Sequence, residues 1–268
     1  MGLRAVRASR EIAKLGYAVL KLDTNERDTL RSLLASADVF FANTAQTKRR
    51  YSGRAANHGF RPFGIEYSIT PEQPDYNECF TLWSTRVDLL PHREEIEPFV
   101  ACIGSWQKVC GEIARGLLTE LAAPFATEAP GFSSASCLQI NHCLPAPPKR
   151  EFLQDRHEDG HILTVLHATD RGLEICADGL PVPVELDNDE VLVFSGSILT
   201  ALTRGAIAPT FHQVRNYGLS ARKSVMYFVN PALDSPVRPW VPGGSHVDLR
   251  DIVRSNPSAF GLPPVEEF

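Results

Sequence analysis

The sequence predicts an α-helical N-terminal half packed against a C-terminal β-barrel or β-sandwich. Up to about residue 130, apolar residues recur at the three-to-four spacing of amphipathic helices. After Ser133 they alternate with polar residues in short runs that Gly, Pro, Asn and Asp separate. Several short strands in succession are typical of a sandwich or a barrel.

The N-terminal half begins with a short helix, a break at Gly16 and an alternating strand over Tyr17 to Leu22. An amphipathic helix is expected to follow over residues 25–42, with Thr24 or Asn25 as its N-cap.

The remaining elements are one long helix and a series of strands. Apolar residues three to four apart over residues 93–123 predict a helix with a single buried stripe, ended by Pro124 and the region of Gly131. The strand-like runs are 136–144, 161–169, 172–176, 180–186, 190–202 and 223–231.

Composition sets limits on function and location. The chain has 268 residues, 43% hydrophobic and 22% charged, with a formal charge of −5. A single domain is expected, in three parts of about 1–130, 131–232 and 233–268. The charge gives no reason to expect nucleic acid or a membrane, so a small molecule is the expected partner. The six cysteines form no CxxC pair and no signal-like or membrane-spanning run occurs, which favours reduced thiols and a cytoplasmic location.

The stretch "DRHEDGHILTVL" places Asp155, His157, Asp159 and His161 at alternate positions. In a strand, residues two apart point to one face at about 6.5 to 7 Å, so two of these side chains can converge on one ion. Metal–ligand bonds are only about 2.0 to 2.2 Å long, so one strand cannot easily supply three ligands. A third ligand from another strand is expected.

His212, in the extended stretch "APTFHQVRN", is the candidate for that third ligand. Two imidazoles and one carboxylate, from His157, Asp159 and His212, form the facial triad that binds Fe(II) in non-haem oxygenases. A second HxD triplet begins at His246, but no histidine follows it, and its Asp248 is better interpreted as a helix cap.

The order and spacing of "HED", "FHQV" and "RKS" resemble the Fe(II)/2-oxoglutarate-dependent dioxygenases of the isopenicillin-N-synthase-like group. "GYAVLKL", "DYNECFTLW", "LQINHCLP" and "GLEI" resemble further motifs of that family. The resemblance implies a mainly β fold with bracing helices, a double-stranded β-helix (a jelly-roll, cupin-like barrel). It also implies an enzyme that uses Fe(II), 2-oxoglutarate as co-substrate and O2.

The resemblance further implies roles for individual residues. Arg222 and Ser224 would bind the distal carboxylate of 2-oxoglutarate, with a bidentate guanidinium and a hydroxyl donor on one strand face. Asn141 would keep a contact with the co-substrate, whereas Cys143 replaces the second tyrosine of the family motif. The family's halogenating relatives have Gly or Ala where this chain has Asp159, so oxygenation is favoured over halogenation.

Substrate residues are expected around the same barrel. Continued strand alternation points Met226 and Phe228 inward, and His161 would belong to the pocket or support a ligand. A loop that contains Arg61, Phe63 and Tyr67 could reach the pocket, and residues 238–253 could form its lid.

The expected function is oxidation of a small metabolite in specialised metabolism, with decarboxylation of 2-oxoglutarate to succinate and CO2. Hydroxylation is the first expectation, with desaturation or cyclisation as alternatives. Two other functions stay open from the sequence: a 2-oxoglutarate-independent Fe(II) oxidase of the same fold, and a non-catalytic barrel that binds a ligand. If Asp159 were not the carboxylate ligand, Asp155 would be the next candidate.

Overall fold

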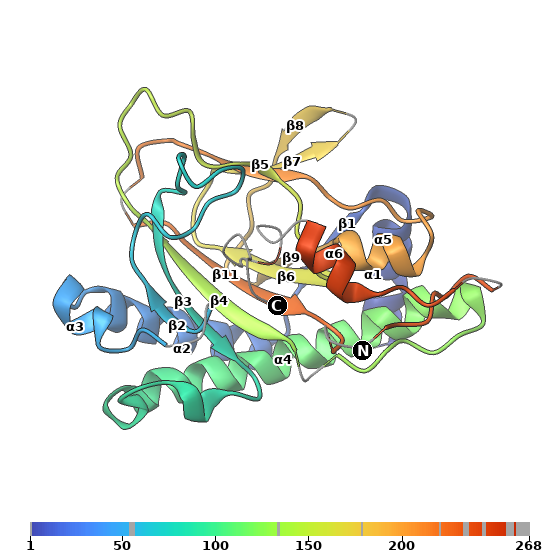
Figure 1. The fold of residues 1–268 in the computed structure, drawn as a ribbon, viewed down its shortest axis with the longest axis horizontal. Helices are drawn as coiled ribbons and strands as arrows, with labels where there is room; N and C mark the ends of the chain where they lie inside the picture. The colour runs from blue at the N-terminus through green and yellow to red at the C-terminus, as the bar shows by residue number, and fades with distance from the viewer. Residues whose placement is uncertain are drawn as a thin grey trace.

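Two antiparallel β-sheets and a layer of helices make up the fold (Figure 1). The computed structural model describes residues 2–53, 57–132, 135–177, 179–219, 221–232, 236–242, 245–255 and 260. The larger sheet has the strand order β1 (Tyr17–Lys21), β9 (Glu190–Ser195), β6 (Leu163–Ala168), β11 (Lys223–Val229), β4 (Cys137–Cys143), β3 (Asn77–Trp83) and β2 (Gly59–Arg61). The smaller sheet has the order β5 (Phe152–His157), β10 (His212–Arg215), β7 (Leu173–Ala177) and β8 (Leu180–Pro183). This is the predicted jelly-roll arrangement.

The helices lie mainly on the outer face of the larger sheet. Figure 1 shows the long helix α4 running along that sheet, on the side away from β5, β7 and β8. The helices are α1 (Gly2–Leu15), α2 (Thr24–Phe41), α3 (Ala45–Arg49), α4 (Glu97–Ala122), α5 (Ser197–Leu202) and α6 (Leu249–Ser255). Short 3-10 helices are η1 (Val87–Leu89), η2 (Arg93–Ile96) and η3 (Ala123–Phe125). No helix in the described ranges is long and apolar enough to span a membrane.

Aromatic side chains join the helices to the larger sheet. Phe40 of α2 stacks on Phe99 of α4 with ring centroids 4.8 Å apart, and it meets Phe80 of β3 edge-on at 5.0 Å. Each such pair adds about 0.5 to 1.5 kcal/mol beyond the burial of its apolar area. These rings belong to a hydrophobic cluster that extends from Ala5 of α1 to Phe260 near the C-terminus. The outer face of the sheet is therefore a packed core, and the chemistry must lie on its inner face.

Three predictions about the N-terminal half are wrong in detail. The cap of α2 is Asp23 rather than Thr24 or Asn25, because Asp23 and Glu26 hydrogen-bond each other's backbone N–H at 2.9 and 2.8 Å in a capping box. The α-helical half also contributes β2 and β3, whose burial on both faces hides the strand alternation. The long helix starts as a 3-10 turn, and α4 begins only at Glu97, with a proline in its first turn.

One C-terminal run changes structure halfway. The run 190–202 was expected to be a strand, but β9 ends at Ser195 and the chain then forms helix α5. The buried residues Ile198, Leu199 and Leu202 occupy one face of that helix. A short apolar run does not distinguish a strand from a buried helix by its periodicity alone.

Candidate metal and co-substrate site

Two histidines face each other across neighbouring strands of the smaller sheet. His157 ends β5 and His212 begins β10, and the two residues are direct partners in the antiparallel register. Directly opposite residues point to the same face, so the two imidazole rings lie together with centroids 4.3 Å apart. The expectation that a ligand candidate comes from a second strand agrees with this geometry.

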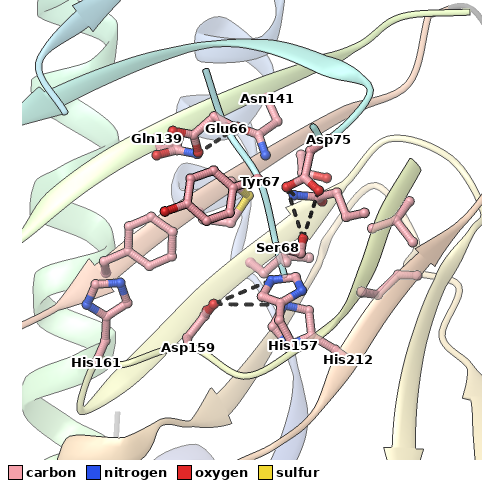
Figure 2. A pocket seen from close by; sticks show the side chains of 17 residues that line it. Glu66, Tyr67, Ser68, Asp75, Gln139, Asn141, His157, Asp159, His161 and His212 are labelled. Carbon is pink, nitrogen blue, oxygen red and sulfur yellow. Dashed lines mark hydrogen bonds and ion pairs between the residues drawn. The ribbon is translucent and has the colours of Figure 1, made fainter. Parts of the chain in front are cut away.

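Asp159 completes a three-residue cluster. Its Oδ1 lies 3.9 Å from Nε2 of His157 and 3.9 Å from Nε2 of His212. One potential ligand atom from each residue lies within 4.8 Å of the other two. Figure 2 shows the three side chains converging at one end of the cavity. Two imidazole nitrogens and one carboxylate oxygen, leaving positions open, are the donor set suited to ferrous iron.

Asp159 lies in a loop rather than on the predicted strand, since β5 stops at His157. The loop is held against the start of α5, where the backbone N–H of Ser197 donates to the carbonyl oxygen of Asp159 at 3.0 Å. A Cβ at Gly196 would come within 2.5 Å of that same oxygen, so a glycine is needed for the close approach. The loop brings the carboxylate back toward the histidines, which a flat strand would not do.

Hydrogen bonds orient the three side chains. Nδ1 of His157 lies 2.7 Å from the carbonyl oxygen of Asp155, and Nδ1 of His212 lies 3.4 Å from that of Thr210. With the proton on Nδ1, each Nε2 presents its lone pair to the cluster. The hydroxyl of Thr164 donates to Oδ2 of Asp159 at 2.6 Å, which leaves Oδ1 for a ligand.

Burial favours the neutral, ligating form of one histidine. Burial, together with the neighbouring His157, lowers the pKa of His212 to about 4. A neutral imidazole at physiological pH has the lone pair that a metal ion requires.

Arg222, just before β11, has a buried guanidinium that contacts Ser224, a residue of the cavity lining. Only 1% of the residue is exposed. Its Nη1 donates to the hydroxyl of Ser224 at 2.7 Å, and its Nε donates to the carbonyl oxygen of Arg171 at 3.0 Å. Nη2 is buried and has no hydrogen-bond partner within the described part of the chain. An unpaired buried guanidinium nitrogen is costly, and a carboxylate is the ligand that it fits best.

Asn141 is a neighbour of Ser224 on the adjacent strand. It is the β4 partner of Ser224 in the antiparallel register, and both residues line the cavity. Its Oδ1 accepts a hydrogen bond from Nε2 of Gln139 at 2.9 Å, and Figure 2 shows its amide nitrogen turned into the cavity. Cys143 contacts Arg222 from the same strand, with 3.7 Å between Sγ and Nη1. A thiol is therefore next to the guanidinium where the family motif has a tyrosine.

The cavity has a volume of about 60 Å³ and opens to solvent. Of the predicted substrate residues, Tyr67, His161, Met226 and Phe228 line it. His161 stacks on Phe228 with ring centroids 4.2 Å apart, and its Nδ1 lies 2.9 Å from Oδ1 of Asn230. Figure 2 shows His161 beside Asp159 in the cavity wall.

Three other candidates lie outside the cavity wall. Phe63 is 44% exposed and packs against the ring of Tyr76. Arg61 is buried behind the lining residues, because β2 turns its guanidinium toward polar groups of β3 and β4. The carboxylate of Asp155 pairs with Arg150 at 2.5 Å.

Several polar lining residues were not singled out in the sequence. They are Glu66, Ser68, Asp75, Gln139 and Gln154. Gln139 could have been found, since it lies two residues before Asn141 on the same strand face. Burial raises the pKa of Asp75 to about 6, and the hydroxyl of Ser68 donates to that carboxyl group at 2.8 Å.

Within the described residues, the C-terminal segment reaches the site through Phe260. Phe260 meets the ring of His161 edge-on at 5.4 Å, and Asn57 donates to its carbonyl oxygen at 3.0 Å. Its ring lies so close to Gly160 that an added Cβ there would be 2.3 Å away. Earlier in the segment, Asp248 accepts from the N–H of Arg250 at 3.0 Å at the start of α6, which confirms its predicted capping role.

Comparisons with known proteins agree with this geometry. Residues 134–231 match the model of the 2OG-Fe(II) oxygenase superfamily. The chain is 26% identical over 183 residues to the gibberellin 2-beta-dioxygenase of Phaseolus coccineus, a match that covers 65% of this chain but only 55% of the relative. It is 27% identical over 255 residues to a 2-oxoglutarate-dependent dioxygenase of Monascus ruber, covering 82% and 76% of the two chains.

A solved structure confirms the fold. A full-length Neurospora crassa protein, solved in complex with alpha-KG, superposes with a TM-score of 0.76 at 15% identity, over 93% of this chain and 90% of that one. Residues 134–231 of the chain therefore belong to the 2OG-Fe(II) oxygenase superfamily, and the chain as a whole has the fold of that solved structure.

Proposed function

We propose that the chain oxidises a small metabolite with Fe(II), 2-oxoglutarate and O2, hydroxylating it and converting 2-oxoglutarate to succinate and CO2. The observation that supports this proposal is the convergence of His157, Asp159 and His212 on a cavity that Ser224 also lines. The hydroxyl of Ser224 is bonded to the buried guanidinium of Arg222, whose Nη2 has no hydrogen-bond partner among the described residues. His157, Asp159 and His212 would hold the ferrous ion, which supplies the oxygen chemistry when bound.

The protein's own groups would bind and orient the co-substrate. Nη2 of Arg222 is free to donate to the distal carboxylate, and Nη1 is already held by Ser224. The amide of Asn141 is directed into the cavity (Figure 2). Because the residue at 222 is almost fully buried, water competes little for these hydrogen bonds.

Tyr67, His161, Met226 and Phe228 would form the substrate wall. Their aromatic and thioether groups exclude water from the reacting carbon and suit a flat or apolar skeleton. The name of the Phaseolus relative refers to a small organic compound, which supports a role in specialised metabolism.

The test is anaerobic binding of Fe(II) and 2-oxoglutarate, followed by turnover. The wild type should bind one Fe(II) per chain and develop a visible charge-transfer band with 2-oxoglutarate. His157→Ala and His212→Ala should abolish that band, because two remaining ligands hold a labile ferrous ion poorly. His246→Ala is the matched control, since His246 is exposed near α6 and should leave the band unchanged.

Full iron occupancy in either cluster variant would refute the ligand assignment. The reaction itself would be measured as substrate-stimulated succinate formation with a metabolite library, with mass spectrometry of the products. A product that gains one oxygen atom would support hydroxylation, and one that loses two hydrogens would refute it in favour of desaturation or cyclisation.

A further inference from the structure

The wall of the cavity opposite the candidate metal ligands His157, Asp159 and His212 carries acidic side chains. Among the described residues that line the cavity, the ionisable side chains are three carboxylates, three histidines and Tyr67, and none is a lysine or an arginine. The carboxylates belong to Glu66, Asp75 and Asp159. Asp159 is one of the three candidate metal ligands, whereas the proposed function uses neither Asp75 nor Glu66. Both oxygens of Asp75 accept from the hydroxyl of Ser68, so Glu66 is the carboxylate considered for the substrate.

Arg61 and Gln139 fix the position of the Glu66 carboxylate. Its Oε1 lies 3.1 Å from Nη2 of Arg61, and its Oε2 accepts from Nε2 of Gln139 at 3.1 Å. Arg61 is fixed in turn, because the same Nη2 donates to Gln139 at 2.8 Å and to Thr81 at 3.0 Å. The guanidinium does not line the cavity, so a ligand meets the carboxylate and not its counter-ion.

The carboxylate of Glu66 keeps room for another hydrogen bond. Each carboxylate oxygen can accept about two, and each has one contact from the protein among the described residues. Its side chain retains 14% exposure, and Figure 2 shows it across the cavity from Asp159 and the two histidines, with Tyr67 between. A molecule placed between the metal cluster and this wall would bring one end to Glu66.

From this arrangement we infer that Glu66 selects substrates whose end remote from the metal donates an amide-type N–H and carries no carboxylate. A carboxylate at that end would face a second carboxylate and leave its acceptors unpaired. A neutral donor fits better than an ammonium group, because Arg61 already balances the charge of Glu66. This inference rests on the proposed function, since it assumes that the cavity holds the substrate.

The test compares isosteric pairs of small ring compounds at neutral pH, where the acids are ionised. The pairs are benzamide and benzoate, nicotinamide and nicotinate, and indole-3-acetamide and indole-3-acetate. Dissociation constants are measured by ligand-observed NMR on Zn(II)-loaded protein saturated with 2-oxoglutarate, which does not turn over. Binding of 2-oxoglutarate is verified first in each protein by calorimetry.

We expect at least two of the amides to bind about tenfold or more tightly than their matched acids. Glu66→Gln should reduce that preference to within about threefold, because a carboxamide no longer repels the acid. Glu72→Gln is the matched control: it removes the same charge from an exposed position in the same loop and should leave the preference intact. Glu66→Asp keeps the charge but withdraws the acceptor, and should weaken amide binding by about threefold or more.

Wild-type protein that binds the acids as tightly as the amides, or no amide at about 10 mM, would overturn the inference. An unchanged preference in Glu66→Gln would do the same. If Glu66→Gln fails to fold because it leaves Arg61 without its ion pair, the wild-type comparison and Glu66→Asp decide the question. Failure to bind 2-oxoglutarate would refute the proposed function and this inference with it, whereas normal 2-oxoglutarate binding without an amide preference refutes this inference alone.

Discussion

Replacing Arg222 with alanine should weaken 2-oxoglutarate binding more than any other single change among the residues assigned to that co-substrate. The guanidinium is 1% exposed, and its Nη2 lacks a hydrogen-bond partner among the described residues. A carboxylate bound there would gain a charge-assisted contact in a site with little water. Removing the guanidinium leaves the bound anion unpaired, which costs about 2 to 4 kcal/mol, or a rise of roughly 30-fold to 1,000-fold in the dissociation constant.

Two further variants divide this effect into its parts. Ser224→Ala removes one neutral donor and should cost about 1 kcal/mol. It also frees Nη1 of Arg222, which now donates to the Ser224 hydroxyl at 2.7 Å. Arg222→Lys should recover part of the lost affinity, because it restores the charge without the planar fork.

The assay is anaerobic titration of the Fe(II)-loaded protein with 2-oxoglutarate, followed by the visible band, and it needs no substrate. Circular dichroism of each variant verifies folding, and iron occupancy is measured in parallel. Wild-type affinity in Arg222→Ala, with full iron occupancy, would show that the guanidinium does not hold the co-substrate. Equal losses in Ser224→Ala and Arg222→Ala would contradict the assignment of the main contact to the charge.

Four other changes have defined outcomes. Asp159→Glu should retain weak iron binding but lower turnover by about tenfold or more, because the added methylene moves the carboxylate by about 1 Å; unchanged succinate formation would exclude Asp159 as the ligand. Asp23→Ala should reduce the free energy of unfolding by about 1 kcal/mol through loss of the capping box with Glu26, measured by urea denaturation; an unchanged midpoint would show that the cap is not needed. The metal-free protein should lose stability as the pH falls below about 6.5. Burial lowers the pKa values of four histidines in the folded protein, so the unfolded chain binds more protons than the folded one in this range. These residues are His58, His161, His167 and His212. Asp75 opposes this trend, since its pKa is raised from 3.8 to about 6 and its contribution is lost as the pH rises through 6. Asp75→Asn should therefore steepen the acid loss by up to about 1.4 kcal/mol per pH unit between pH 4 and 6 in urea titrations, and a parallel profile would refute the shift.

The candidate site residues could be identified from the sequence by itself, because ligand chemistry depends on residue type and because residues two apart in a strand point to one face. The HxD triplet, the later histidine and the RxS pair each lie in a short extended run or beside one. The residue types predicted the metal ligands, and the resemblance of the whole set to a known family predicted the anion-binding role of Arg222 and Ser224. Strand alternation also predicted that Met226 and Phe228 line the cavity, and helical spacing predicted the long helix α4.

Only the tertiary structure decided how these residues meet and what surrounds them. Asp159 reaches the histidines through a loop held by Ser197, a contact between segments 38 positions apart that no periodicity encodes. The same holds for Glu66, which becomes part of the cavity wall because Arg61 of β2 and Gln139 of β4 fix its carboxylate. Such contacts depend on which strands become neighbours, and that choice is set by the packing of the whole core rather than by any one segment.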